Sequence, residues 1–181
     1  MIALIHHPLA FEFGLSDPDI QLLQQSETQA LQQVVRVVAN SPTTARDLNR
    51  HYGVPLEIID VILPGTDRIH TLAPRIQKNE DHLDQVHLLS VGSIIPRKGF
   101  HHLIAALEPL VDLPWTLSIA GDTSRNAAAY ERLMTDIRDC HLEGRVEVLG
   151  TVSNEELKNQ YAKADIFVLP SLFEGYGCLL Y

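Results

Sequence analysis

Residues 86–99 read VHLLSVGSIIPRKG, and this stretch decides the fold that the sequence predicts. Its first six residues, Val86 to Val91, form a short, mostly apolar run that is typical of a buried strand. Gly92 follows and lets the backbone turn closely. Beyond the turn, apolar residues recur at the spacing of one helix face, at Phe100, Leu103, Ile104, Leu107 and Leu110. The stretch therefore predicts a strand, a glycine turn and an amphipathic helix in succession.

The same alternation extends along the chain in both directions. We expect further strands at 2–5, 34–39, 57–63, 115–120, 145–149 and 165–169. Helices are expected to open at Asp17-Pro18, at Ser41-Pro42 and at Ser153, and another helix face runs from Tyr130 to Ile137. The first of these helices is expected to bury Leu22, Leu23, Ala30 and Leu31. Apolar strands separated by helices indicate an α/β fold with a doubly wound parallel sheet, whose chemistry lies at the carboxyl ends of its strands.

Composition and charge exclude several classes of protein. The chain has 181 residues, with 14 Lys and Arg against 23 Asp and Glu, so its formal net charge is −9. This acidic surplus argues against a nucleic-acid partner, whose binding needs a basic surface. No apolar run reaches the roughly 18 residues of a membrane span, and Met1 to Pro8 lacks the basic start of a signal peptide. Two cysteines, Cys140 and Cys178, cannot make a disulfide framework, which favours a reducing cytoplasm.

Two adjacent cations, Arg97 and Lys98, stand just before the helix that starts at Phe100. Both side chains could reach a phosphate bound at Gly92. The stretch is not a P-loop, because Arg97 replaces that motif's second glycine and Gly99 replaces its hydroxyl residue. The alternative is a solvated cationic helix start, but cations at the positive end of a helix dipole are unfavourable without an anion. We therefore favour an anion site in this loop.

Three other strand-end loops carry polar residues with weaker signals. Asp122 either serves a ligand or caps the following helix. Hydroxyls in the loop at 150–153 are more often helix caps than ligand groups. After the last strand, Glu174 precedes Gly175 and Gly177, and glycines allow a ligand to approach backbone N–H groups. A glycine turn with a solvated glutamate is the alternative for such a motif taken alone.

Seven segments of the chain resemble the motifs of one known family, and the last four of them match in order and spacing. They are IHHPLAFEFGL (5–15), VVANSPTTARDL (37–48), VILPGTD (61–67), VGSIIPRKG (91–99), IAGD (119–122), RVEVLGTV (145–152) and ADIFVLPSLFEGYG (164–177). The ordered set resembles the retaining GT-B glycosyltransferases of group 1, which use nucleotide sugars. The resemblance implies that 1–66 is the end of an acceptor domain and 67–85 a linker or surface loop. Residues 86–181 would be a donor nucleotide-sugar-binding domain, incomplete at its C-terminus.

The resemblance also implies which residues bind the diphosphate of the donor. Arg97 and Lys98 would take its negative charge at the turn of Gly92. Backbone N–H groups of the later glycine turn would help, namely those around Gly175, Gly177, Cys178 and Leu179. Ser93 stands where the family usually has a phosphate-binding arginine, so the clamp is expected to rest on Arg97 and Lys98.

Other parts of the site follow from the same resemblance. Glu174 matches the first Glu of the family's Glu-x7-Glu signature and would bind hydroxyls of the donor sugar. Thr151 and Val152 would lie near the base. On the acceptor side, His6 rather than His7 matches the family's strand-end histidine, and we expect Glu174, Lys98 and His6 to carry the catalysis.

The implied substrates are a UDP- or GDP-sugar donor and a glycan, lipid or small-molecule acceptor of unknown identity. No cofactor or metal is expected, because the adjacent pairs His6-His7 and His101-His102 lack the spacing of metal ligands. A Rossmann dehydrogenase is disfavoured, because no G-x-G-x-x-G occurs.

The second signature Glu would fall just beyond Tyr181, and the first strands of the acceptor domain are not seen before Met1. We therefore expect an internal fragment of a hexosyltransferase that binds a nucleoside diphosphate weakly and transfers no sugar. The alternative is a non-catalytic module that binds a nucleotide or a sugar phosphate.

Overall fold

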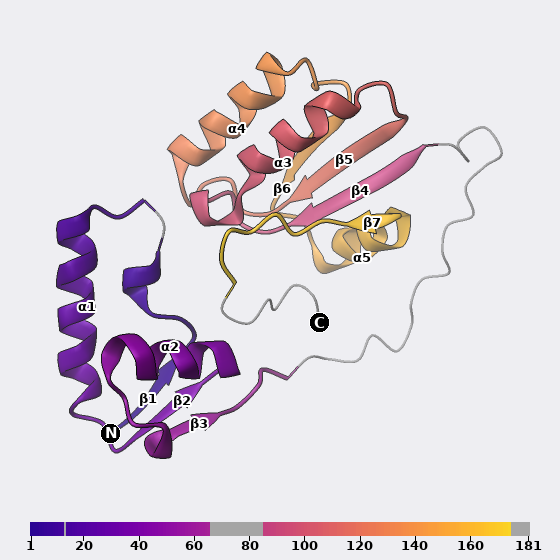
Figure 1. Ribbon diagram of the computed structural model, residues 1–181. Helices are drawn as coiled ribbons and strands as arrows, with labels where there is room; N and C mark the ends of the chain where they lie inside the picture. The colour runs from indigo at the N-terminus through magenta and orange to yellow at the C-terminus, as the bar shows by residue number, and fades with distance from the viewer. Residues whose placement is uncertain (13, 66–84, 175–181) are drawn as a thin grey trace. The chain divides into compact units, whose positions relative to one another are not determined.

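The computed structural model describes residues 1–12, 14–65 and 85–174, which fall into two units with separate sheets (Figure 1). The first unit contains residues 1–65 together with 173–174, and the second contains 85–172. Each unit is described by itself.

The first unit is a parallel sheet of three strands in the order β1-β2-β3. Its elements are β1 (Ile2–Ile5), α1 (Asp17–Leu31), β2 (Arg36–Ala39), α2 (Pro42–Tyr52) and β3 (Ile59–Val61), with single 3-10 turns at Leu9–Phe11 and Leu56–Ile58. The strand predicted at 57–63 is shorter, because its first two residues belong to the second 3-10 turn.

Both helices of the first unit begin at a serine cap followed by a proline in the first turn. The Ser16 hydroxyl accepts from the Asp19 N–H, and the Ser41 hydroxyl accepts from the Thr44 N–H. The cap predicted at Asp17 is therefore one residue off. α2 ends at Gly53, whose φ of 65° is the left-handed conformation expected after a helix.

Within the described residues of the first unit, the helices cover one face of its sheet and no helix covers the other. Val37 and Ala39 of β2 are fully buried against the helices, together with Leu31 of α1 and Leu48 of α2. The prediction that α1 also buries Leu22 is wrong, because that side chain is 65% exposed. Ala30 is exposed as well, so the apolar stripe predicted for α1 contracts to its C-terminal end.

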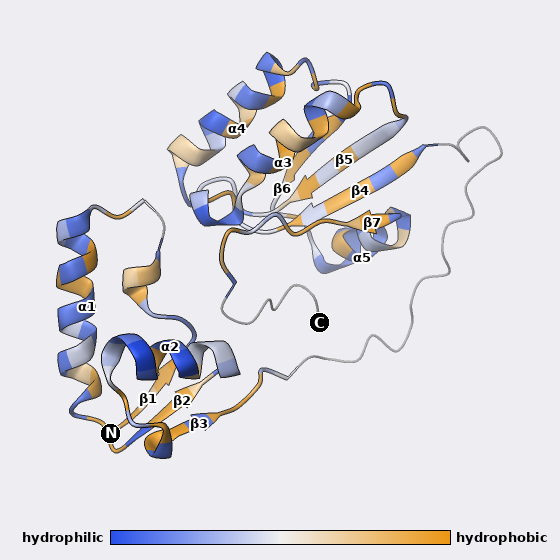
Figure 2. Cartoon of the chain, viewed as in Figure 1, coloured by the Kyte–Doolittle hydropathy of each residue, from blue (hydrophilic) through white to orange (hydrophobic). Residues whose placement is uncertain are grey.

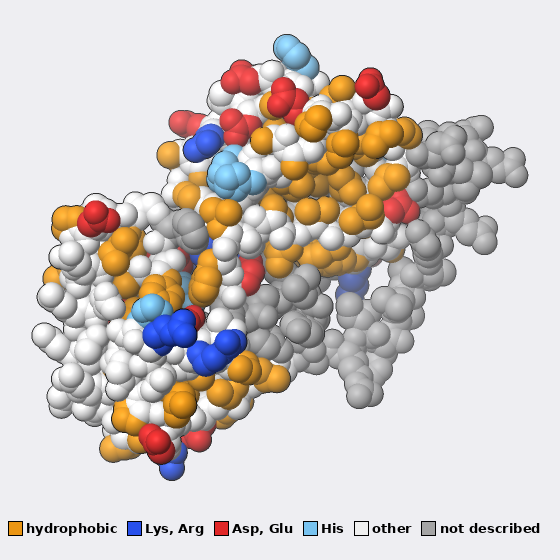
Figure 3. All heavy atoms as spheres, in the orientation of Figure 1, with side chains coloured by type: hydrophobic (Ala, Val, Ile, Leu, Met, Phe, Trp, Pro, Cys, Tyr) orange, Lys and Arg blue, Asp and Glu red, His pale blue; other side chains and the backbone are white. Residues whose placement is uncertain are grey.

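Alternate residues of β1 point to the opposite face of this sheet. Ile2 and Leu4 are 65% and 62% exposed there. Further exposed apolar side chains, Ile62 and Leu63, follow β3, where Figure 3 shows hydrophobic atoms at the surface. Parallel sheets are normally covered on both faces, so we expect this apolar surface to promote association.

The second unit is a parallel sheet of four strands in the order β6-β5-β4-β7. Its elements are β4 (Val86–Val91), η4 (Pro96–Lys98), α3 (Phe100–Leu107), η5 (Glu108–Leu110), β5 (Trp115–Ala120), α4 (Ala127–Asp139), β6 (Val146–Gly150), α5 (Asn154–Lys163) and β7 (Ile166–Phe167). Figure 1 shows α3 and α4 on one side of the sheet and α5 on the other. The predicted doubly wound parallel sheet is confirmed.

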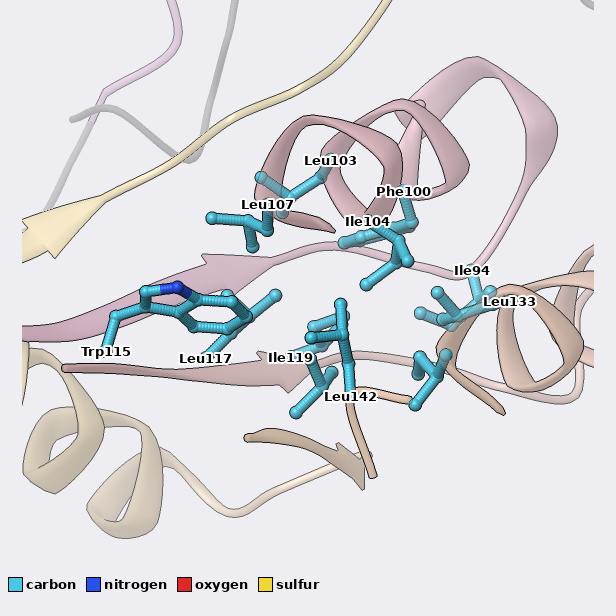
Figure 4. Close-up of a cluster of buried hydrophobic side chains, with 12 residues drawn as sticks. Ile94, Phe100, Leu103, Ile104, Leu107, Trp115, Leu117, Ile119, Leu133 and Leu142 are labelled. Carbon is cyan, nitrogen blue, oxygen red and sulfur yellow. The ribbon is translucent and has the colours of Figure 1, made fainter. Parts of the chain in front are cut away.

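The core of the second unit lies between the sheet and the helices α3 and α4 (Figure 4). Leu117 and Ile119 of β5 meet Ile104 of α3 and Leu133 of α4 there, each at most 1% exposed. Figure 2 shows the matching pattern, with hydrophobic strands and helices that are hydrophilic on their outer faces. None of the helices in the described ranges is both long and apolar enough to cross a membrane.

Two glycines of the second unit lie against backbone carbonyl groups of neighbouring loops. A Cβ at Gly121 would lie 1.9 Å from the Gly92 carbonyl oxygen, and a Cβ at Gly99 would lie 2.2 Å from the Pro170 carbonyl oxygen. Real Cβ atoms do not approach that closely, so both positions need glycine. The ends of β4, β5 and β7 can lie together only because these side chains are absent.

We expect Gly121→Ala to lower the free energy of unfolding of the second unit by about 1–3 kcal/mol, because the methyl group must displace the Gly92 carbonyl. The protein's single tryptophan, Trp115 on β5, reports urea unfolding by its fluorescence. Gly144→Ala is the control, since a Cβ there meets nothing within 4 Å. Equal stability of the two variants would contradict the steric argument.

We also expect the chain to associate through the uncovered face of the first sheet. Leu4→Ser should reduce concentration-dependent association measured by light scattering, because it removes an exposed apolar side chain from that face. Leu22→Ser is the matched control, since Leu22 is equally exposed but lies on α1. A wild-type chain that stays monomeric at all concentrations would refute this expectation.

Candidate functional site

The loops that follow the strands of the second unit lie along one edge of its sheet and are joined by backbone hydrogen bonds. The N–H groups of Gly92, Gly121, Ile94 and Leu172 donate to the carbonyls of Ala120, Gly150, Asp122 and Arg97 respectively, at 2.8–2.9 Å. The carboxyl ends of parallel strands are where such folds place their sites. The predicted alignment of the four loops is therefore confirmed for the described residues.

Lys98 lies over the turn at the end of β4. Its side chain is only 8% exposed, and a Cβ at Gly92 would lie 3.5 Å from both Cδ and Cε of Lys98. The single turn η4 ends at Lys98, and Gly99 follows in the left-handed conformation with φ 66°. A buried ammonium group attracts an anion more strongly than a solvated one does. The structure thus brings together Gly92 and Lys98, as the sequence predicts.

Arg97, the other predicted cation, is half-buried in the same turn. Its carbonyl accepts from the Leu172 N–H at 2.9 Å, so the chain after β7 is attached to this turn. The close approach of Pro170 to Gly99 is a second attachment. The cationic turn is therefore held at two points by the chain after β7.

The loop after β5 is shaped by Asp122, which does not cap α4. Its Oδ1 accepts from the Ser124 N–H at 2.8 Å and from the Ser124 hydroxyl at 2.7 Å. These two bonds hold the pKa of Asp122 below its usual range. The cap of α4 is Asn126, whose side chain accepts from the Ala129 N–H at 2.9 Å. The helix-cap alternative for Asp122 is thus wrong.

Arg125 lies in the same loop and was not singled out by the sequence. Its Nη1 donates a long hydrogen bond, 3.5 Å, to the hydroxyl of Ser93 in the loop after β4. The only sequence signal for this contact is indirect: loops that follow adjacent parallel strands lie side by side.

The loop after β6 contains the residues predicted to lie near a base. Thr151 is exposed and Val152 is half-buried. Ser153 forms a capping box with Glu156 at the start of α5, which confirms the helix-cap interpretation of that hydroxyl. Thr151 and Val152 therefore remain free of the cap, at the same edge as Lys98.

The chain after β7 continues through Val168 and Leu169 to Pro170 and Ser171. The hydroxyl of Ser171 is buried and has no hydrogen-bond partner within the described part of the chain. Glu174 is half-buried and belongs to the first unit. The other predicted residues of this segment, Gly175, Gly177, Cys178 and Leu179, lie outside the described residues.

The two histidines after β1 differ in their surroundings. His6 is exposed, and its carbonyl accepts from the Thr44 hydroxyl at 3.2 Å. His7 is half-buried, with Nε2 2.6 Å from a carboxylate oxygen of Glu12 and its ring 6.4 Å from that of Phe173. The preference for His6 stays a prediction.

Within residues 1–12, 14–65 and 85–174, no group of three or more His, Cys, Asp or Glu side chains could hold a metal ion. The ring centroids of His101 and His102 lie 3.8 Å apart, and the two rings are tilted by 40°. That the site works without a metal stays a prediction.

The sequence model described as "Glycosyl transferases group 1" matches residues 74–181, more than half of the chain. Curated relatives include the D-inositol 3-phosphate glycosyltransferases of Paenarthrobacter aurescens and Pseudarthrobacter chlorophenolicus. The first is 29% identical, and the alignment covers 88% of this chain and 41% of the relative. The second is 30% identical, and the alignment covers 93% of this chain and 41% of the relative. The chain thus spans about two fifths of the length of these relatives.

Two solved structures share the fold. Sucrose-phosphate synthase from Thermosynechococcus elongatus aligns over 98% of this chain and 46% of its own, with a TM-score of 0.78 and 22% identity. Anabaena HepE, in complex with UDP and glucose, aligns over 98% and 48%, with a TM-score of 0.77 and 20% identity.

Removing the Ser124 hydroxyl should raise the pKa of Asp122 toward its ordinary value, because one of two hydrogen bonds to the charged carboxylate is lost. Carboxyl carbon shifts followed by NMR against pH measure this in Ser124→Ala. Since the folded pKa is the lower one, these bonds stabilise the fold above the ordinary pKa, and the contribution fades as pH falls. Ser153→Ala is the control, which should raise the pKa of Glu156 and leave the pKa of Asp122 unchanged. An unchanged Asp122 in Ser124→Ala would refute the assignment.

Proposed function

Because this chain belongs to the group 1 glycosyl transferases and has the fold of GT-B enzymes, we propose that it is part of a hexosyltransferase. The enzyme would move a sugar from a nucleotide-diphosphate sugar to an acceptor, with retention of configuration at the anomeric carbon. One observation carries the assignment of the donor site. Lys98 is buried at the carboxyl end of β4 and lies directly over Gly92.

The chemistry that this site offers is electrostatic. Cleavage of a sugar–diphosphate bond builds negative charge on the leaving group, and fixed positive groups stabilise that charge in the transition state. Lys98 and Arg97 would take this role, with backbone N–H groups at Gly177, Cys178 and Leu179 adding to it. The proposal assigns the diphosphate charge to these groups and needs no metal.

The remaining roles follow the resemblance of the motifs. Glu174 would hold hydroxyls of the donor sugar, Thr151 and Val152 would lie along the base, and His6 would face the acceptor. The structure of HepE holds UDP and glucose, so UDP-glucose is the first donor to test, with GDP-sugars as the second class. The names of the curated relatives make a phosphorylated polyol the first acceptor to test, ahead of glycans and lipids.

A cytoplasmic location is part of the proposal, supported by cysteine use without a disulfide framework. The second candidate is a module that binds a nucleotide or a sugar phosphate without transfer. Because the chain covers about two fifths of the length of its curated relatives, binding should be tested separately from catalysis.

We expect Lys98→Ala to weaken the binding of UDP or GDP about 10-fold or more, because a charge-assisted bond at a buried site is lost. Isothermal titration calorimetry of the 181-residue chain measures this. Lys158→Ala is the control, since Lys158 is exposed on α5, outside the loops of the site.

Unchanged affinity in Lys98→Ala would mean that the donor pocket is misassigned. A donor-hydrolysis and transfer assay with UDP-glucose runs in parallel. Turnover by the 181-residue chain would overturn the expectation that it binds without transferring sugar.

A further inference from the structure

We infer that Arg125, on the loop after β5, is a third cation for the donor diphosphate, reaching it from across the turn that carries Arg97 and Lys98. The inference rests on the proposed function and adds a binding residue to that site. It starts from the contact between Arg125 Nη1 and the Ser93 hydroxyl, which joins two strand-end loops by their side chains.

The backbone of Arg125 is fixed on both sides. Ser124 before it is held by two hydrogen bonds to Asp122, and Asn126 after it caps α4. Asp122 is in turn joined to the loop after β4, because its carbonyl accepts from the Ile94 N–H at 2.9 Å. The start of the Arg125 side chain is therefore held in register with Gly92 and Ser93.

The charge of Arg125 is available to a ligand. In the described part of the chain, no ion pair involves this guanidinium, and its hydrogen-bond acceptor is a neutral hydroxyl. The nearest acid along the chain is Asp122, whose pKa is lowered mainly by the bonds that its Oδ1 accepts from Ser124 and in part by the charge of Arg125. The contact between an exposed cation and a neutral hydroxyl is weak, so an anion bound between the two loops would interact with Arg125 more favourably than Ser93 does.

The three cations suit different parts of a diphosphate. Lys98 is a buried point charge beside Gly92, whereas a guanidinium presents a planar fork that binds two oxygens at once. The Ser93 hydroxyl, one residue after Gly92, is the acceptor that this fork contacts, so the guanidinium lies beside the loop after β4. Arg125 would thus add a cation on the β5 side of the site, opposite the two that the loop after β4 contributes.

The test is calorimetric titration of the whole chain with UDP, UMP and uridine. Arg125→Gln should weaken UDP binding about 5- to 20-fold, because one exposed charge-assisted contact with the diphosphate is lost, and should barely change uridine binding. Arg125→Lys should recover part of the loss. Arg132→Gln is the matched control, because Arg132 is also exposed but lies on α4, where its Nε is 3.9 Å from Oδ2 of Asp136.

The outcomes separate this inference from the function on which it rests. Loss in both Lys98→Ala and Arg125→Gln, with Arg132→Gln unchanged, supports it. Loss in Lys98→Ala alone overturns the role of Arg125 and leaves the donor site standing. Equal losses in Arg125→Gln and Arg132→Gln show a general charge effect and overturn it. No binding of UDP or GDP by the wild-type chain overturns both proposals.

Discussion

The second unit depends on the close approach of backbone to backbone at the carboxyl ends of its strands. The Gly92 carbonyl takes the space that a side chain at 121 would fill, and the Pro170 carbonyl does the same at 99. With both glycines in place, hydrogen bonds join each strand-end loop to a neighbouring one. The site is therefore a property of the sheet edge rather than of any one loop, and Lys98 is buried because the turns around it are pinned.

The loops at this edge carry the cations Arg97, Lys98 and Arg125, although the chain as a whole has a net charge of −9. The acids of the loops are engaged locally: Asp122 accepts from Ser124, and Glu156 accepts from the Ser153 N–H. Both interactions keep the carboxylates charged yet satisfied by short-range donors. Both carboxylates thus have hydrogen-bond donors within their own loops, next to the cations that the proposed anion site would use.

Sequence periodicity predicted the strands, the turn at Gly92 and most of the helix faces, because those features are encoded within a few consecutive residues. Leu110, predicted on the helix face that starts at Phe100, lies after α3 and is 41% exposed. Periodicity also failed for Leu22, because apolarity alone does not bury the side chain of a helix. It left the role of Asp122 open between a ligand group and a helix cap, and the cap of α4 is Asn126, four residues later. Periodicity could not predict the role of Arg125, because its partner Ser93 is 32 residues away in the sequence. The two residues are neighbours only because β4 and β5 are adjacent in the sheet.

The contacts at Gly99 and Gly121 also limit how this sequence can diverge. When a new side chain collides with another side chain, a second substitution can make room by shrinking the neighbour. Here the obstructing atoms are carbonyl oxygens, which every amino acid carries, so no change at 92 or at 170 removes them. A lineage that lost either glycine could regain the site only by reversion or by rebuilding the path of an entire loop.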